Sequence, residues 1–275
     1  MVDSLSLSKR VFNSLIISIL FGLSIYFFPN WVFSIFISVL VGFSLKEFYG
    51  IVEKKGIFVY KTFGITIGML VPVIVHLQMG NEGYFTLEPF FIVIACLFTF
   101  VLQMTRRDGS QALASIAATL FGLLYIAWFL SFSIKLKFLP NGTLLVIFLV
   151  IVTKLGDIGA YFIGSYMGKH SLMPRISPKK TIEGTVGGLL FSMAGALLSK
   201  MYLPAFSYQH LFILGALLGV LGQVGDLAES LLKRDCGVKD SGTNLSGFGG
   251  FLDLLDSLLF TTPIFCFYVM VLMKI

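Results

Sequence analysis

Residues 143–167 read TLLVIFLVIVTKLGDIGAYFIGSYM, an apolar run in which Lys154 and Asp157 are the only charged side chains. A helix needs about 20 consecutive apolar residues to cross the hydrocarbon core of a bilayer. The run therefore predicts a transmembrane helix. The whole chain has the same character, because 57% of its residues are hydrophobic and 12% are charged. An ordinary soluble domain has roughly 25% charged residues.

Similar apolar runs recur along the 275 residues and predict an all-α, polytopic integral membrane protein. A soluble protein of this length could not bury so much apolar surface in one core. We expect the first run to be a membrane helix and not a cleaved signal peptide, because a second run follows it at once. About nine transmembrane helices are expected, at residues 11–28, 32–51, 60–79, 88–105, 112–134, 143–167, 184–203, 208–232 and 251–273.

The Lys and Arg residues predict the orientation of these helices. With the N-terminus in the cytoplasm, fifteen of the twenty fall on the cytoplasmic side, four fall on the far side and Lys154 lies within a helix. This asymmetry follows the positive-inside rule. We therefore expect an inner or plasma membrane protein with a cytoplasmic N-terminus and a site that faces the cytoplasm. The net charge of +6 reflects this bias, and no basic run interleaved with aromatics predicts a nucleic-acid partner.

The two halves of the chain differ in where their charges fall. Residues 1–140 carry charges at the expected membrane edges and are predicted to be an N-terminal scaffold. Residues 141–275 carry charges within spans, glycine clusters and two unusual loops, and are predicted to be the catalytic region. No repeat or low-complexity linker separates the halves. We expect one continuous membrane body with its chemistry in the second half.

Lys154 and Asp157 form the first candidate constellation. Residues at i and i+3 share one face of a helix. Charged groups inside a membrane span are costly and by default mark a functional site or an internal partner. The alternative is a mutually neutralising pair that holds helices together. Nearby glycines at 156, 159 and 164 would allow close approach of another backbone or of a ligand.

The loop at residues 168–188, GKHSLMPRISPKKTIEGTVGG, is the second constellation. Thr181, followed by Glu183 and Gly184, predicts the start of the next helix, and a helix N-terminus favours an anion. The loop therefore predicts a triphosphate cradle. An ordinary positive-inside loop that touches anionic lipid headgroups is the alternative. The residues expected to contribute are Arg175, Ser177, Lys179, Lys180 and Thr181.

Residues 226–256, DLAESLLKRDCGVKDSGTNLSGFGGFLDLLD, gather six of the fourteen acidic residues. Asp226 and Glu229 share one helix face, and Asp253 and Asp256 share a face of the next helix. Facing carboxylates hold hard cations through oxygen ligands. The stretch therefore predicts a magnesium site, with substrate phosphates completing the coordination. A solvated loop with interhelical salt bridges is the alternative.

These residues resemble the phosphatidate cytidylyltransferase family, the CDP-diacylglycerol synthases. The similarity covers about residues 150–260, and the first half matches only as a series of spans. The ISPKKTIEGTVGG segment at 176–188 and Asp157-Ile-Gly-Ala-Tyr161 are similar to family segments. The family's usual His and Arg are replaced here by Phe248 and Leu254. The C-terminal signature is matched by Ser230, Lys233, Arg234, Lys239, Asp240, Gly247, Gly249, Gly250, Asp253 and Asp256.

The resemblance implies transfer of the cytidylyl group of CTP to phosphatidic acid, with Mg²⁺ as cofactor and a possible second, monovalent cation such as K⁺. It implies Asp226 and Asp253 as metal ligands, supported by Asp157, Asp256 and Ser230. It also implies a homodimer. The residues expected to bind substrate phosphates are Ser177, Lys179, Lys180 and Thr181 for CTP, and Lys233, Arg234 and Lys239 for lipid phosphate or pyrophosphate. Ser230 and Asp240 are also expected to bind substrate.

Three other functions compete with this one. A CTP-dependent polyprenol or lipid kinase would transfer the γ-phosphoryl group to an alcohol, but an alcohol benefits from a base, and Phe248 stands where a histidine could have served. An ion-coupled transporter would use Lys154, Asp157 and the acidic residues as an ion path. A family member that has lost activity is the third, because of Phe248 and Leu254.

Overall fold

A computed structural model describes residues 25–80, 87–106, 109–242 and 250–273, and the structural statements below concern these residues. Within them, eight helices are long and apolar enough to cross a membrane. They correspond to the last eight of the nine predicted spans, and the all-α, polytopic fold class is confirmed. The predicted span 11–28 lies mostly outside the described residues. The total of nine helices and the cytoplasmic N-terminus therefore stay predictions.

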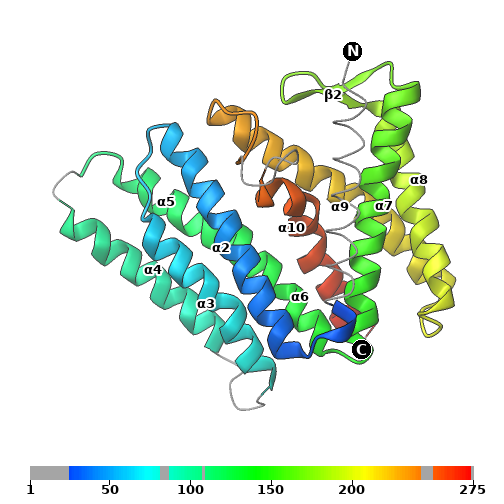
Figure 1. Ribbon diagram of the computed structural model, residues 1–275, viewed down its shortest axis with the longest axis horizontal. Coiled ribbons are helices and arrows are strands. Elements are labelled where there is room, and N and C mark those ends of the chain that lie inside the picture. The colour runs from blue at the N-terminus through cyan, green and yellow to red at the C-terminus, as the bar shows by residue number, and fades with distance from the viewer. Residues whose placement is uncertain (1–24, 81–86, 107–108, 243–249, 274–275) are drawn as a thin grey trace. The chain divides into compact units, whose positions relative to one another are not determined.

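The chain divides into two compact units, and the first contains Met1–Phe138 together with Asp235–Leu254. The helix α2 begins directly after Pro29, its N-cap residue. A six-residue π-helical stretch, η2 (Leu123–Trp128), joins two helices into one long span. The helices of this unit are α2 (Asn30–Lys54), α3 (Lys61–Gly80), α4 (Leu87–Thr105), α5 (Ala112–Gly122) and α6 (Phe129–Phe138) (Figure 1).

Tyr49 organises the centre of the first unit. Its side chain is fully buried, and its hydroxyl donates a hydrogen bond to the Thr119 carbonyl oxygen at 2.8 Å. A Cβ on Gly64 would lie 2.5 Å from the tyrosine oxygen, and one on Gly122 would lie 2.7 Å from a ring carbon. The absence of a side chain at these glycines of α3 and α5 therefore leaves the space that the Tyr49 ring of α2 fills.

The second unit contains Leu139–Arg234 and Leu255–Ile275. Its long helices are joined by a two-stranded antiparallel hairpin and short 3-10 and π-helical turns. The helix α10 crosses from one unit to the other. The elements are α7 (Gly142–Met167), β1 (Ser171–Met173), β2 (Ser177–Thr181), α8 (Ile182–Leu198), η3 (Ser199–Met201), α9 (Tyr208–Asp235), α10 (Phe251–Phe267) and η4 (Tyr268–Leu272).

Helices α7 and α8 run side by side in the second unit (Figure 1). A Cβ on Gly188 would lie 2.9 Å from the Gly156 carbonyl oxygen, so glycine is needed where the two backbones meet. Ser192 donates a hydrogen bond across the same contact to the Val152 carbonyl oxygen at 3.1 Å. The close approach expected from the glycines of α7 is confirmed. Inside a membrane the hydrophobic effect does not drive helices together, and small residues favour their association by allowing close van der Waals packing and interhelical hydrogen bonds.

The hairpin is a finding that the sequence did not predict. The segment was expected to be a loop between two helices, and Ser171 instead pairs with Thr181 in an antiparallel register. Pro174 and Pro178 cannot supply backbone N–H groups, which disfavours a helix here. The first unit includes Asp235–Leu254 as well as Met1–Phe138. The predicted division at residue 140 and the single continuous membrane body stay predictions. The scaffold and catalytic roles of the two halves stay predictions.

Candidate active site

A cavity of about 480 Å³ lies in the second unit, between α7, the hairpin, α8 and α9. Its volume falls within the range of small-molecule sites, roughly 300–1,000 Å³. Two carboxylates and two lysines converge on it, and Thr181 and Gln223 add uncharged polar groups. The charged residues of its wall are Asp157, Lys179, Lys180 and Asp226. A cavity with this lining suits a ligand that carries both negative charge and a bound cation.

The hairpin and the start of α8 supply the basic side of the cavity. Thr181 is the N-cap of α8, and its side-chain oxygen accepts a hydrogen bond from the Gly184 N–H at 3.1 Å. This confirms the predicted helix start and aims the N-terminus of α8 at the cavity. Glu183 holds the other end of the hairpin, because its carboxylate accepts from the Lys169 N–H at 3.1 Å and pairs with the His170 ring at 2.6 Å.

Three carboxylates on α9 and α10 form an acidic cluster next to the cavity, and Asp226 is the one of them that lines the cavity wall. Oxygens of Asp226, Glu229 and Asp256 all lie within 4.8 Å of one another. Glu229 is 1% exposed and Asp256 is 7% exposed, so both are buried. Two neighbouring lysines compensate part of the charge: Lys180 pairs with Asp226 at 2.8 Å, and Lys233 pairs with Glu229 at 2.9 Å. An all-oxygen set of this kind fits Mg²⁺, which prefers hard oxygen ligands.

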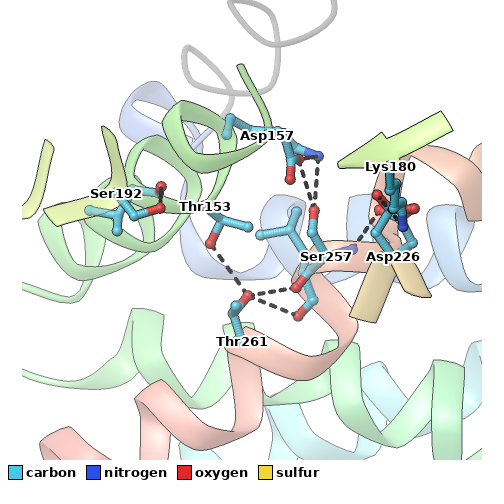
Figure 2. Close-up of polar contacts among 11 residues, drawn as sticks. Thr153, Asp157, Lys180, Ser192, Asp226, Ser257 and Thr261 are labelled. Atoms are coloured by element: carbon cyan, nitrogen blue, oxygen red, sulfur yellow. Dashed lines mark hydrogen bonds and ion pairs between the residues drawn. The ribbon is translucent and has the colours of Figure 1, made fainter. Parts of the chain in front are cut away.

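Asp157 of α7 and Ser257 of α10 form part of a hydrogen-bonded network (Figure 2). The Lys154 ammonium lies 2.9 Å from Asp157 Oδ2 and donates to Ser257 Oγ at 3.2 Å. Ser257 in turn donates to Asp157 Oδ2 at 3.0 Å. The predicted pairing of Lys154 with Asp157 on one helix face is confirmed. Asp157 also lines the cavity, so the network holds one carboxylate of the cavity wall in a fixed orientation.

The other predicted residues lie in different surroundings. Asp253 is not among the three clustered carboxylates; it belongs to the first unit, where its Oδ2 accepts a hydrogen bond from the Gly250 N–H at 2.7 Å. Lys239 and Asp240 are exposed residues of that same unit. In the second unit, Ser230 is half-buried on α9.

Three more of the predicted basic or polar residues lie at or near the hairpin. Arg234 donates from Nε to the Ile176 carbonyl oxygen at 3.3 Å, which ties the end of α9 to the hairpin turn. Ser177 begins β2 and is half-buried, and Lys179 on the same strand is exposed. Phe248 lies outside the described residues.

Sequence reasoning missed two site residues. Glu229 was recognised on the face of Asp226 but was not chosen as a metal ligand, although its i+3 spacing carried the signal. Ser257 was not singled out, because a serine within an apolar helix has no distinctive pattern. Its role follows only from the contact between α7 and α10.

The fold and site define a class of protein: a polytopic membrane protein with a lysine-rich hairpin beside a buried group of carboxylates. Comparison with known proteins then identifies the family. The model of the cytidylyltransferase family matches residues 8–272, and the chain belongs to this family.

Several relatives carry the name phosphatidate cytidylyltransferase. One from Synechocystis sp. is 30% identical over 98% of both chains. One from Bacillus subtilis is 35% identical over 65% of each chain. The uncharacterized protein YnbB of Escherichia coli is 35% identical over 68% of this chain and 65% of its own. The matches to YnbB and the B. subtilis protein thus span about two thirds of those relatives, and the Synechocystis match is nearly complete.

Proposed function

We propose that this protein transfers the cytidylyl group of CTP to phosphatidate, with CDP-diacylglycerol and pyrophosphate as products for phospholipid biosynthesis. Membership of the cytidylyltransferase family and the near full-length match to the Synechocystis phosphatidate cytidylyltransferase support this reaction. The observation that carries it is the ion pair of Lys180 with Asp226 on the wall of one cavity. It brings a phosphate-binding hairpin and a cation-binding carboxylate to the same place.

The hairpin side of the cavity binds the CTP phosphates in this proposal. Lys179 and Lys180 offer positive charge. The N-terminus of α8, which begins directly after its N-cap Thr181, offers a helix dipole and backbone N–H groups. Ser177 begins the same strand and adds a hydroxyl donor. Charge-assisted hydrogen bonds of this kind are about twice as strong as neutral ones. The triphosphate would therefore be held with its α-phosphorus toward the carboxylates.

The chemical step needs little beyond positioning and charge neutralisation. A phosphate oxygen of phosphatidate attacks the α-phosphorus of CTP, a new P–O bond forms, and the bond to pyrophosphate breaks with its electron pair leaving on pyrophosphate. The attacking oxygen is already anionic, so no general base has to remove a proton. Proximity and orientation then supply most of the rate enhancement. Lys233 and Arg234 lie at the end of α9 and would neutralise lipid phosphate or pyrophosphate, with Lys239 and Asp240 as further substrate-binding residues.

The donor set fits the Mg²⁺ that the family implies. Asp226, Glu229 and Asp256 would hold it, because their oxygens lie within 4.8 Å of one another. When bound, Mg²⁺ supplies positive charge that stabilises the pyrophosphate leaving group. Asp157 stays oriented toward the cavity through Lys154 and Ser257. Ligation by Asp253, support by Ser230 and a second monovalent cation such as K⁺ stay predictions.

The chain is an integral membrane protein, and its position in the cell is part of the proposal. The excess of Lys and Arg on one predicted side supports a plasma or inner membrane location with the cavity facing the cytoplasm. CTP is a charged, water-soluble nucleotide, and phosphatidate is a lipid of the bilayer. A site at the cytoplasmic ends of α7, α8 and α9 would meet both. The homodimer stays a prediction from the family resemblance.

A label-tracking assay tests the reaction. Purified protein in detergent receives phosphatidate, Mg²⁺ and CTP labelled at either the α- or the γ-phosphorus. Cytidylyl transfer places only the α-label in the lipid fraction. Entry of the γ-label into an added lipid alcohol would instead identify a kinase. Absence of both labels from lipid, with folded protein, would refute the proposal and make ion transport the next function to test.

Two variants connect the assay to the site. Asp226→Asn removes the charge of a cavity carboxylate and is expected to lower turnover at least 100-fold, as losses at catalytic charges commonly do, on the order of 10²–10³. Asp235→Asn is the matched control, because Asp235 is an exposed aspartate of the same helix that pairs with Lys55. Near-normal turnover of Asp226→Asn would contradict the assignment.

A further inference from the structure

Glu47 is a buried acid in the half of the chain that the sequence predicts to be scaffold. It lies on α2 within the first unit, and only 5% of its surface is exposed. Burial of a carboxylate is costly unless hydrogen bonds or opposite charges compensate it. Its partners therefore indicate what the side chain is for.

The partners of Glu47 lie on both sides of the glycine-rich segment that precedes α10. Glu47 Oε2 accepts a hydrogen bond from the Leu252 N–H at 3.0 Å and one from Ser241 Oγ at 3.4 Å. Leu252 is the second residue of α10. The first four N–H groups of a helix have no partner within the helix. Glu47 therefore caps α10 from a different helix.

Two glycines make this contact possible. A Cβ on Gly242 would lie 2.7 Å from Glu47 Oε1, and a Cβ on Gly250 would also collide with the glutamate carboxylate. Phe43, one turn earlier on α2, stacks on Phe251 with ring centroids 4.7 Å apart. Residues at i and i+4 share a helix face, so one face of α2 holds the start of α10 by an aromatic contact and a hydrogen bond to a carboxylate.

We propose that Glu47 is a positioning residue that fixes the N-terminal turn of α10, the turn that carries Asp253 and leads into Asp256. This inference rests on the proposed function. Asp253 Oδ2 accepts from the Gly250 N–H at 2.7 Å, so a second carboxylate fixes the same turn from within. Glu47 is therefore proposed to act on the site through α10.

The test compares Glu47→Ala with Glu47→Gln and with Glu53→Ala. Glu53 is the matched control, since it lies on the same helix but is exposed and pairs with Lys61 at 2.8 Å. The first readout is the rate of tryptic cleavage after the exposed Lys239, which reports local opening of the segment before α10. We expect cleavage of Glu47→Ala to be at least fivefold faster, and Glu47→Gln, which keeps an acceptor oxygen, to stay within about threefold of wild type.

The second readout is turnover with CTP and phosphatidate. Glu47→Ala is expected to lower kcat at least tenfold with KM for CTP within about twofold, because the cavity that would bind the triphosphate is lined without any residue of α2. Glu53→Ala is expected to match wild type in both assays. A general loss of folded protein would lower the active fraction of enzyme without faster cleavage of the folded fraction.

A double-mutant cycle keeps the inference testable where Glu47→Ala does not fold. Gly242→Ala is expected to reduce activity through its collision with Glu47, and Glu47→Asp, with a side chain one carbon shorter, is expected to restore at least half of that loss. Coupled effects of this kind identify residues in contact. The inference is overturned by unchanged cleavage and kcat in Glu47→Ala, or by independent effects of the Gly242→Ala and Glu47→Asp changes.

The same set of experiments separates the two proposals. Wild-type protein that places the α-label of CTP in lipid supports the function whatever Glu47 does. Wild-type protein that does not would refute the function, and the tryptic cleavage of Glu47→Ala would still test whether Glu47 holds the start of α10.

Discussion

Replacement of Lys180 by methionine is the sharpest test of the cavity as the CTP site. Lys180 lies on the hairpin strand β2 and pairs with Asp226 at 2.8 Å, with 25% and 39% of the two side chains exposed. Methionine keeps most of the length of the side chain and removes its charge. The variant therefore removes a phosphate ligand while it preserves much of the packing.

The expected magnitude follows from the contact. A hydrogen bond to a charged group contributes about 1.5–3 kcal/mol, and each 1.4 kcal/mol is a factor of ten, so kcat/KM for CTP should fall roughly 10- to 140-fold. The effect on stability should be much smaller. Ion pairs that water reaches contribute about 0–1 kcal/mol. Loss of activity should therefore greatly exceed any loss of folded protein.

The assay is the initial rate of α-label transfer at saturating phosphatidate, with the folded fraction measured by size-exclusion chromatography. Lys180→Arg keeps the charge and is expected to lie between wild type and Lys180→Met. Lys169→Met is the matched control, because Lys169 is an exposed lysine that precedes the same hairpin and lines no part of the cavity. A change in kcat/KM of less than threefold in folded Lys180→Met would refute the phosphate-binding role.

Three further predictions concern the acidic cluster, the N-cap of α8 and the contact between α7 and α8. Glu229→Gln should raise the Mg²⁺ concentration for half-maximal rate about tenfold or more, because it removes the charge of one of three clustered oxygen donors; a Mg²⁺ titration of the rate measures this. Thr181→Val should lower the free energy of unfolding by about 1 kcal/mol through loss of the cap to the Gly184 N–H, measured by thermal unfolding in detergent. Gly188→Val should yield little folded protein by size exclusion, because its side chain would enter the backbone of α7 at Gly156.

Each of these predictions has an opposing result. An unchanged Mg²⁺ midpoint in Glu229→Gln would remove this residue from the cation site. An unfolding temperature of Thr181→Val equal to that of wild type would show that water or another group replaces the threonine cap. Normal yield of Gly188→Val would mean that α7 and α8 separate easily. A Gly80→Ala variant is the control for the glycine change, because a Cβ at that helix end meets no described residue within 4 Å.

The membrane helices were predictable because the bilayer imposes a local rule. Any helix that crosses hydrocarbon must be apolar for about 20 residues, and this requirement can be read from each segment alone. The predicted span 143–167 and the observed α7, Gly142–Met167, differ by one residue at the start. The pairing of Lys154 with Asp157 was predictable for the same reason, since i and i+3 neighbours meet within a single helix.

The hairpin was not predictable in this way, because no comparable local rule specifies how its strands pair. Ser171–Thr181 contains two prolines and several polar residues, a composition that indicates a loop without specifying its pairing. Glu183, which follows the hairpin, contacts Lys169 and His170, which precede it, and this contact between the two ends of the segment is not visible in the sequence. A short strand has no apolar periodicity to reveal it when neither face packs on a core.

The sequence by itself determined the fold class, the family and the residue types of the site, because hydropathy and motif spacing are local properties of the chain. Only the tertiary structure decided which of these residues meet. It brought Asp256 to Asp226 and Glu229, joined Ser257 to Lys154, and gave Glu47 of α2 a place at the start of α10. These contacts join residues far apart in the chain, and their partners are set by how helices pack, which no single segment encodes.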